Sequence, residues 1–234
     1  MTSPGRAEEV HRHPSDLIGS VILGLNDGIV TTLVFVLSVA AVSGSGRHAV
    51  VVAGLAEMLA GGVSMFLGGY SAARAVKEAY LYQVEVERHE IREEPEEERA
   101  EVSRMYRDKG FGGALLEQIV RHVTSDPERW LHVMVRDELG RPPEEQSASW
   151  QAGVAIGMSF MAGALVPLIA FLVGVPQPRW TAVILSICAL VVTGAARSRF
   201  SRKTWLRGAG EMVAIGLLGT LAGYLIGTVL AVAF

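Results

Sequence analysis

Five long apolar runs constrain the fold more than any other feature of this sequence. They lie at about 17–42, 49–73, 150–175, 180–196 and 209–234 in a chain of 234 residues, of which 50% are hydrophobic and only 19% charged. A helix needs about 20 apolar residues to cross the roughly 30 Å hydrocarbon core of a bilayer. Each run approaches or exceeds that length. The sequence therefore predicts an all-α, polytopic membrane protein with five transmembrane helices.

The basic residues predict how these spans are oriented. With a cytoplasmic N-terminus, the outer loops 43–48 and 175–179 hold only Arg47 and Arg179 of the 21 Lys and Arg residues. Basic residues in short loops favour the cytoplasmic side, so we expect this orientation, with the C-terminus outside. The expected parts are a cytoplasmic tail at 1–15, spans one and two at 16–75, a cytoplasmic domain at 76–147 and spans three to five at 148–234.

The segment 76–147 reads as a small helical domain between the second and third spans. Residues 76–94 continue the second run with few helix breakers, and Pro95 should end that helix because proline lacks an N–H and disfavours helical geometry in the residue before it. Further helices are expected at 96–107, 112–123 and 127–139, the last opened by a proline at its first position. Acidic residues outnumber basic ones in this segment.

Two carboxylates lie inside the first two apolar runs. Asp27 is about ten residues into its run, roughly 15 Å deep, and Glu57 reaches a similar depth from the other side. A charged side chain in a span is costly and is tolerated mainly where it faces a partner, a cavity or an ion path. The alternative is a pair of buried, protonated carboxyls with a structural role. With Asn26, Met58 and Met65 nearby, we predict an ion path.

The methionines indicate which cation such a path would carry. Glu57 and Met65 are eight residues apart, so they lie within about 80° of each other on a helix. A thioether is a poor ligand for magnesium or calcium and a better one for softer transition metals. We therefore expect Fe(II), Mn(II), Co(II) or Zn(II) as the substrate and no prosthetic group. Packing is the alternative role for Met58 alone.

The acidic domain contains a candidate metal site. Two pairs of glutamates, each with members three residues apart and thus on one helix face, lie on either side of Pro95, where the chain can fold back. A methionine and a glutamate one turn apart on the last domain helix complete the set. The predicted ligands are Glu87 with Glu90, Glu98 with Glu101, and Met134 with Glu138. The alternative is a solvated acidic face.

Glycines four residues apart predict close contacts between helices. Gly24 and Gly28 flank Asp27, and a second series in the fifth run begins at Gly219. Small residues at this spacing let membrane helices approach closely. We therefore expect a homodimer, with Gly24 and Gly28 at its interface.

These motifs together resemble the vacuolar iron transporter family. The resemblance rests on the string GLNDGIV at 24–30, on Glu57-Met58, Ser64-Met65 and Gly69-Tyr70, and on the two Glu-x-x-Glu pairs, and it covers most of the chain. It implies a homodimer with the translocation path at its interface, which moves Fe(II) and often Mn(II) out of the cytosol in exchange for protons. It also implies that Asp27, Glu57 and Met65 line the path and that the domain glutamates, with Met134, bind metal. The expected location is the cell membrane of a prokaryote, which we favour, or the vacuolar membrane of a eukaryote.

Other functions fit the sequence less well. A manganese exporter of the same family is the first alternative. A membrane-anchored metal-binding or sensing protein would not need carboxylates at the bilayer midplane, and a ferritin-like ferroxidase would need a Glu-x-x-His motif, which the segment 76–147 lacks. We find no phosphate loop, nucleophile triad or nucleic-acid motif, so we expect a transporter and not an enzyme, with no nucleic-acid partner.

Overall fold

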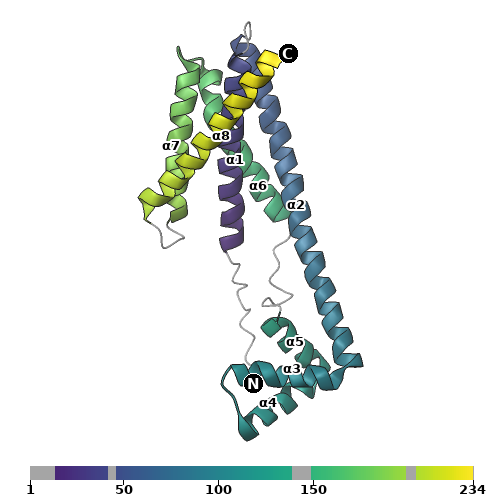
Figure 1. Cartoon of the computed structure of the whole chain (residues 1–234). Coiled ribbons are helices and arrows are strands. Elements are labelled where there is room, and N and C mark those ends of the chain that lie inside the picture. Colours follow the sequence, from purple (N-terminus) through teal and green to yellow (C-terminus); the bar gives the residue numbers. More distant parts are fainter. Residues whose placement is uncertain (1–13, 42–45, 139–148, 199–203, 234) are drawn as a thin grey trace, which may run out of the picture. The chain divides into compact units, whose positions relative to one another are not determined.

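The computed structural model describes residues 14–41, 46–138, 149–198 and 204–233, with the backbone alone at 14–17 and 222–233. All elements in these ranges are α-helices (Figure 1). In chain order they are α1 (Pro14–Ala41), α2 (Arg47–Glu93), α3 (Pro95–Asp108), α4 (Gly113–Thr124), α5 (Pro127–Glu138), α6 (Ser149–Val173), α7 (Pro178–Ser198) and α8 (Trp205–Ala233). The all-α prediction is confirmed for this part of the chain. Nearly all of the predicted tail 1–15 lies outside it.

Four described helices are long and apolar enough to cross a bilayer. They contain the segments Ile18–Ala41, Arg47–Glu93, Ser149–Val173 and Pro178–Ser198. The fifth predicted span corresponds to α8, a helix of 29 residues. The side chains of α8 beyond Leu221 lie outside the described residues. The chain is therefore an integral membrane protein, and the fifth span stays a prediction.

Proline positions account for the helix boundaries after the second span. Helix α2 runs for 47 residues without a break and ends at Glu93, and α3 begins at Pro95, as predicted. The helices α3, α4 and α5 match the ranges expected from the sequence to within one residue at each end. Asp126 caps α5, because its Oδ1 accepts a hydrogen bond from the backbone N–H of Arg129 at 2.8 Å.

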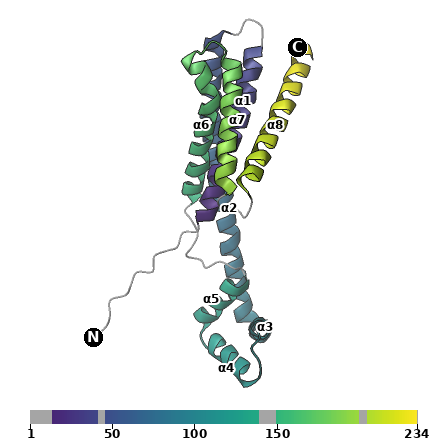
Figure 2. The ribbon, with the colours of Figure 1, turned by 90° about the vertical axis from the view of Figure 1, so that its left-hand side faces the viewer.

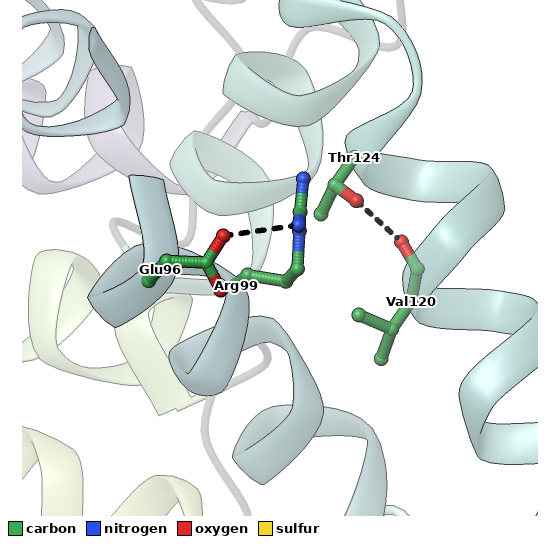
Figure 3. A network of polar contacts seen from close by, with 4 residues as sticks. All are labelled: Glu96, Arg99, Val120 and Thr124. Carbon is green, nitrogen blue, oxygen red and sulfur yellow. Dashed lines mark hydrogen bonds and ion pairs between the residues drawn. The ribbon is translucent and has the colours of Figure 1, made fainter. Parts of the chain in front are cut away.

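The chain divides into two compact units, which we describe separately. The membrane unit contains α1, α2 up to Ala73, and α6 to α8, and the acidic unit contains α2 from Arg74, with α3 to α5. In the acidic unit α4 packs against α3 and α5. Figure 3 shows two polar contacts of this unit: Arg99 lies 3.3 Å from Glu96 within α3, and the Thr124 hydroxyl donates to the Val120 carbonyl within α4 at 2.9 Å.

In the membrane unit, α1 packs closely against α6, and α7 packs against α8 (Figure 1 and Figure 2). Gly24 and Gly28 are buried in the α1–α6 contact. A Cβ atom added to Gly24 would lie 3.0 Å from the backbone N of Phe160, and one added to Gly28 would lie 2.8 Å from that of Ala164. The expectation that these glycines form a dimer interface is therefore wrong, since α6 of the same chain occupies their face.

The two basic residues expected in the outer loops are both held at helix ends. Arg47 donates from Nε to the carbonyl of Phe171 at 2.7 Å and from Nη2 to that of Leu172, both in the last turn of α6. Arg179 donates to the carbonyl of Ala40 in the last turn of α1. These carbonyls lack partners within their own helices, and a cation there is favourable. Both arginines therefore stabilise the ends of spans.

Candidate functional site

The carboxylates of Asp27 and Glu57 lie near each other in the membrane unit. Asp27 is in α1 and Glu57 in α2, and their negative charges are close enough to repel. Each accepts a hydrogen bond from a threonine of α1. The Thr31 hydroxyl donates to Asp27 Oδ1 at 3.2 Å, and the Thr32 hydroxyl donates to Glu57 Oε2 at 2.7 Å. The structure thus brings together the two carboxylates that the sequence placed at one depth.

Helix geometry explains why adjacent threonines serve different carboxylates. Thr31 is one turn after Asp27, so its hydrogen bond stays within α1. Thr32 points about 100° away from it around the helix, is fully buried, and reaches across to Glu57 of α2. Our sequence reasoning missed both threonines. For Thr31 the available signal was a hydroxyl residue one turn after a carboxylate within an apolar helix, whereas no such signal marks Thr32.

The other predicted path residues lie in different surroundings from one another. Asn26 Oδ1 is buried and accepts no hydrogen bond from the described residues. Met58 packs against the apolar cluster that includes Leu168 and Phe171, which fits its alternative role in packing. Met65 is half-buried on α2. Within the described contacts, nothing joins Met65 to either carboxylate, so its place in the path stays a prediction.

The acidic unit buries a pair of glutamates. Glu87 of α2 is 6% exposed and Glu98 of α3 is 7% exposed, and the two share a hydrogen bond. Burial is the main cause that raises the pKa of Glu87 to about 8. The negative charges of Glu98, Glu138 and Glu90 act in the same direction. Burial also raises the pKa of Glu98, as does the charge of Glu101, whereas the hydrogen bond from Glu87 lowers it.

The negative charges of all five predicted glutamate ligands therefore act on one another. These glutamates come from α2, α3 and α5. At neutral pH the Glu87 carboxyl keeps its proton and donates a hydrogen bond to Glu98. Glu87 Oε1 and Glu98 Oε2 are buried without a hydrogen-bond partner among the described residues. No three acidic, histidine or cysteine side chains in the described ranges are grouped closely enough to hold one metal ion. A bound ion would have to draw these carboxylates closer together.

Met134, the remaining predicted ligand, and the histidines of the acidic unit lie outside this group of glutamates. Met134 is fully buried in the apolar core that also contains Val102 and Trp130. His122 Nε2 lies 3.2 Å from Arg129 Nη1, and since arginine can only donate, this nitrogen is the acceptor. His89 and His132 are exposed. The apolar packing of Met134 fits a structural role, so its role as a metal ligand stays a prediction.

Comparison with known proteins covers both groups of carboxylates. The model of the VIT family matches residues 18–228. The chain is 31% identical over 221 residues to vacuolar iron transporter 1 of Tulipa gesneriana, which covers 93% of this chain and 88% of the relative. It is 32% identical over 221 residues to vacuolar iron transporter 2 of Oryza sativa subsp. japonica, with 92% and 88% covered. It is 30% identical over 221 residues to vacuolar iron transporter 1 of Arabidopsis thaliana, with 92% and 87% covered. On these matches, the chain belongs to the VIT family.

Proposed function

We propose that this protein moves Fe(II), and also Mn(II), out of the cytosol in exchange for protons. Its family and the names of its relatives support metal transport, so it is a membrane transporter and not an enzyme. The observation that carries the proposal is the approach of Asp27 and Glu57 within the membrane unit, each with a hydroxyl donor. A mere membrane anchor has no need of two neighbouring carboxylates in its spans.

The chemistry of these groups suits exchange between a metal ion and a proton. A carboxylate in a low-dielectric surrounding binds either a proton or a dication, and loading with metal expels the proton. The free Asn26 Oδ1 supplies a neutral oxygen nearby. The Met65 thioether would favour softer ions such as Fe(II), Co(II) or Zn(II) over magnesium. Asp27, Glu57 and Met65, with Asn26, are thus the proposed path, and Met58 supports it by packing.

The acidic unit is proposed to collect metal from the cytosol. Glu87 and Glu98 would bind the ion after the proton that they share has left, with Glu90, Glu101 and Glu138 close enough to add charge. A dication favours the ionised form of all these groups. The two buried oxygens that lack partners are the groups that a cation would satisfy.

Location and assembly complete the proposal. The tail 1–15 and the segment 76–147 are placed in the cytoplasm, because Arg47 and Arg179 are the only basic residues on the opposite side. The named relatives are vacuolar proteins of plants, so they do not favour the prokaryotic cell membrane that we expected. The homodimer stays part of the proposal, with an interface away from the face of Gly24 and Gly28.

Uptake into liposomes tests this function. Purified protein would be reconstituted with a metal-sensitive dye inside and, in parallel, a pH-sensitive dye, and presented with Fe(II), Mn(II), Co(II), Zn(II) and Mg(II). We expect uptake of the transition metals with a counterflow of protons, and loss of both in Glu57→Gln. Met58→Leu is the matched control, because leucine can keep the packing. A sensing protein would bind metal and transport none.

A further inference from the structure

One buried hydroxyl joins the two helices that carry the candidate path. The Thr32 side chain is fully buried, and its Oγ1 donates to Glu57 Oε2 at 2.7 Å, across 25 positions of sequence. Thr32 is the only described residue that donates a side-chain hydrogen bond to Glu57. Such a contact orders a carboxylate without neutralising it, because the donor is uncharged.

The backbone of Thr32 is held firmly by its neighbours. Ile29, Leu33 and Val36 of the same helix are all at most 4% exposed, and Gly28 lies against α6 with no room for a side chain. A β-branched side chain in a helix has few accessible rotamers. The hydroxyl of Thr32 is therefore fixed in space before any ion arrives, whereas Glu57 has a flexible stem and is pushed by the charge of Asp27.

We propose that Thr32 is a positioning residue for metal transport. By holding Oε2 of Glu57 it fixes the carboxylate against repulsion from Asp27, so that Glu57 offers Oε1 to the cation as a single-oxygen ligand. This inference rests on the proposed function. It assigns Thr32 an effect on metal affinity, because partners that orient a ligand alter affinity even though they do not touch the metal. A purely structural threonine would affect stability and leave affinity unchanged.

The test compares metal uptake by full-length variants in liposomes. Thr32→Val keeps the shape and removes the hydroxyl, and Thr32→Ser restores the hydroxyl in a smaller side chain. We expect Thr32→Val to raise the KM for Mn(II) by about tenfold or more, as removal of a partner that orients a ligand does elsewhere. Thr32→Ser should stay within about twofold of the wild-type KM, an allowance that corresponds to less than about 0.5 kcal/mol. Should Thr32→Val fold poorly, Thr32→Ala removes the same hydroxyl.

The matched control is Thr193→Val. Thr193 is a half-buried threonine of α7 whose hydroxyl donates to the carbonyls of Ala189 and Leu190 in its own helix. Its replacement should leave the KM for Mn(II) unchanged. An unchanged KM in Thr32→Val, or an equal rise in Thr32→Ser and Thr32→Val, would overturn the inference while wild-type uptake upheld the proposed function. A wild-type protein that moved no metal would refute both.

Discussion

The two pairs of carboxylates in this protein, one in the membrane unit and one in the acidic unit, are stabilised in opposite ways. In the membrane unit, Asp27 and Glu57 each accept a hydrogen bond from a neutral threonine hydroxyl. In the acidic unit, Glu87 and Glu98 are bonded to each other, with further negative charge around them. A hydroxyl donor stabilises the ionised carboxylate, whereas a neighbouring carboxylate stabilises a shared proton. Asp27 and Glu57 therefore have separate hydrogen-bond donors, whereas Glu87 and Glu98 form a pair that holds a proton.

This difference separates two tasks. A site that must pass an ion onward needs ligands of fixed direction, and the hydrogen bonds from Thr31 and Thr32 would supply that for the proposed path. A site that collects an ion from water can exchange a held proton for it, as the Glu87–Glu98 pair would. If the comparison is correct, neutralising a carboxylate of the proposed path should stop transport, and neutralising Glu87 should weaken metal binding and reduce its dependence on pH.

The largest expected effect is that of Asp27→Asn. Asparagine keeps an Oδ1 that accepts the Thr31 hydrogen bond, so the fold should persist, while the charge is lost. We expect Mn(II) and Fe(II) uptake into liposomes to fall to the level of protein-free liposomes, with a melting temperature close to that of the wild type. Metal binding that depends on Glu87 should be retained in the same variant.

The control for that experiment is Thr31→Val, which keeps Asp27 charged and removes its hydroxyl donor. Uptake by Thr31→Val should be reduced less than uptake by Asp27→Asn, because the hydrogen bond lies within one helix. Wild-type uptake by Asp27→Asn would show that this carboxyl is structural, and the comparison between the two groups would then rest on Glu57 alone.

The second largest expected effect is the pH dependence of the stability of the acidic unit. The pKa of Glu87 is raised from its ordinary value of 4.5 to about 8, so the folded state binds an extra proton between these values. Stability from this group is complete below about pH 4.5 and is lost as pH rises through about 8. The protection of α3 to α5 against hydrogen exchange in the full chain, measured relative to the intrinsic exchange rate at each pH, should therefore fall over this window. Glu87→Gln, which cannot ionise, should flatten that response.

The same proton affects metal binding. A dication must displace it, so the affinity for Mn(II) should increase from pH 6 to pH 8 in the wild type. Glu87→Gln should bind more weakly and show a smaller dependence on pH. Glu93→Gln is a suitable control, because Glu93 is exposed at the end of α2 and is not among the charges that raise the pKa of the buried pair. Equal pH dependence in wild type and Glu87→Gln would mean that the pair holds no exchangeable proton.

Much of the helical layout was predictable because proline and apolar length fix it locally. Pro95 and Pro127 mark the starts of α3 and α5, and their effect on the backbone does not depend on tertiary contacts. The grouping of the domain glutamates was predictable for a similar reason, since a spacing of three residues selects one face of a helix. The chain had only to change direction at Pro95.

Contacts between distant helices were not predictable in the same way. The spacing of Gly24 and Gly28 indicates a close helix partner but does not say which one, and the partner is α6 and not a second copy. The bond from Thr32 to Glu57 depends on how α1 and α2 are rotated toward each other. A single sequence contains no periodicity that fixes this rotation for two largely apolar helices.

A smaller effect is expected at Arg47, whose positive charge lies at the C-terminal end of α6 in the membrane unit. Arg47→Ala removes the hydrogen bonds to the Phe171 and Leu172 carbonyls of α6 and should destabilise the protein by about 1–3 kcal/mol. Arg47→Lys should recover part of that loss, because a lysine keeps the charge near the helix terminus. Thermal unfolding in detergent measures both. The KM for Mn(II) should not change, and a changed KM would place Arg47 within the path.

The smallest effect is expected at Ser186, because its side chain lacks a hydrogen-bond partner of the kind that Asp27 and Glu57 have. Ser186 is fully buried in α7, and its hydroxyl has no hydrogen-bond partner among the described residues. It lines a small cavity with apolar residues of α1 and α8, including Val30 and Val213. An unpaired buried hydroxyl is unfavourable, so Ser186→Ala should leave stability unchanged or raise it by up to about 1 kcal/mol. Ser159→Ala is the matched control.

The Ser159 hydroxyl differs from that of Ser186 because it donates to the Ala155 carbonyl of its own helix. Ser159→Ala should therefore lower the melting temperature slightly, or leave it unchanged, while Ser186→Ala should not lower it. Both variants should transport Mn(II) at the wild-type rate, because neither hydroxyl donates to a carboxylate of the described residues. A clear loss of stability in Ser186→Ala alone would mean that its hydroxyl is paired in the membrane, for example by a buried water. The pairing of polar groups in the membrane unit would then extend beyond Asp27 and Glu57 to α7, and the contrast with the acidic unit would be sharper.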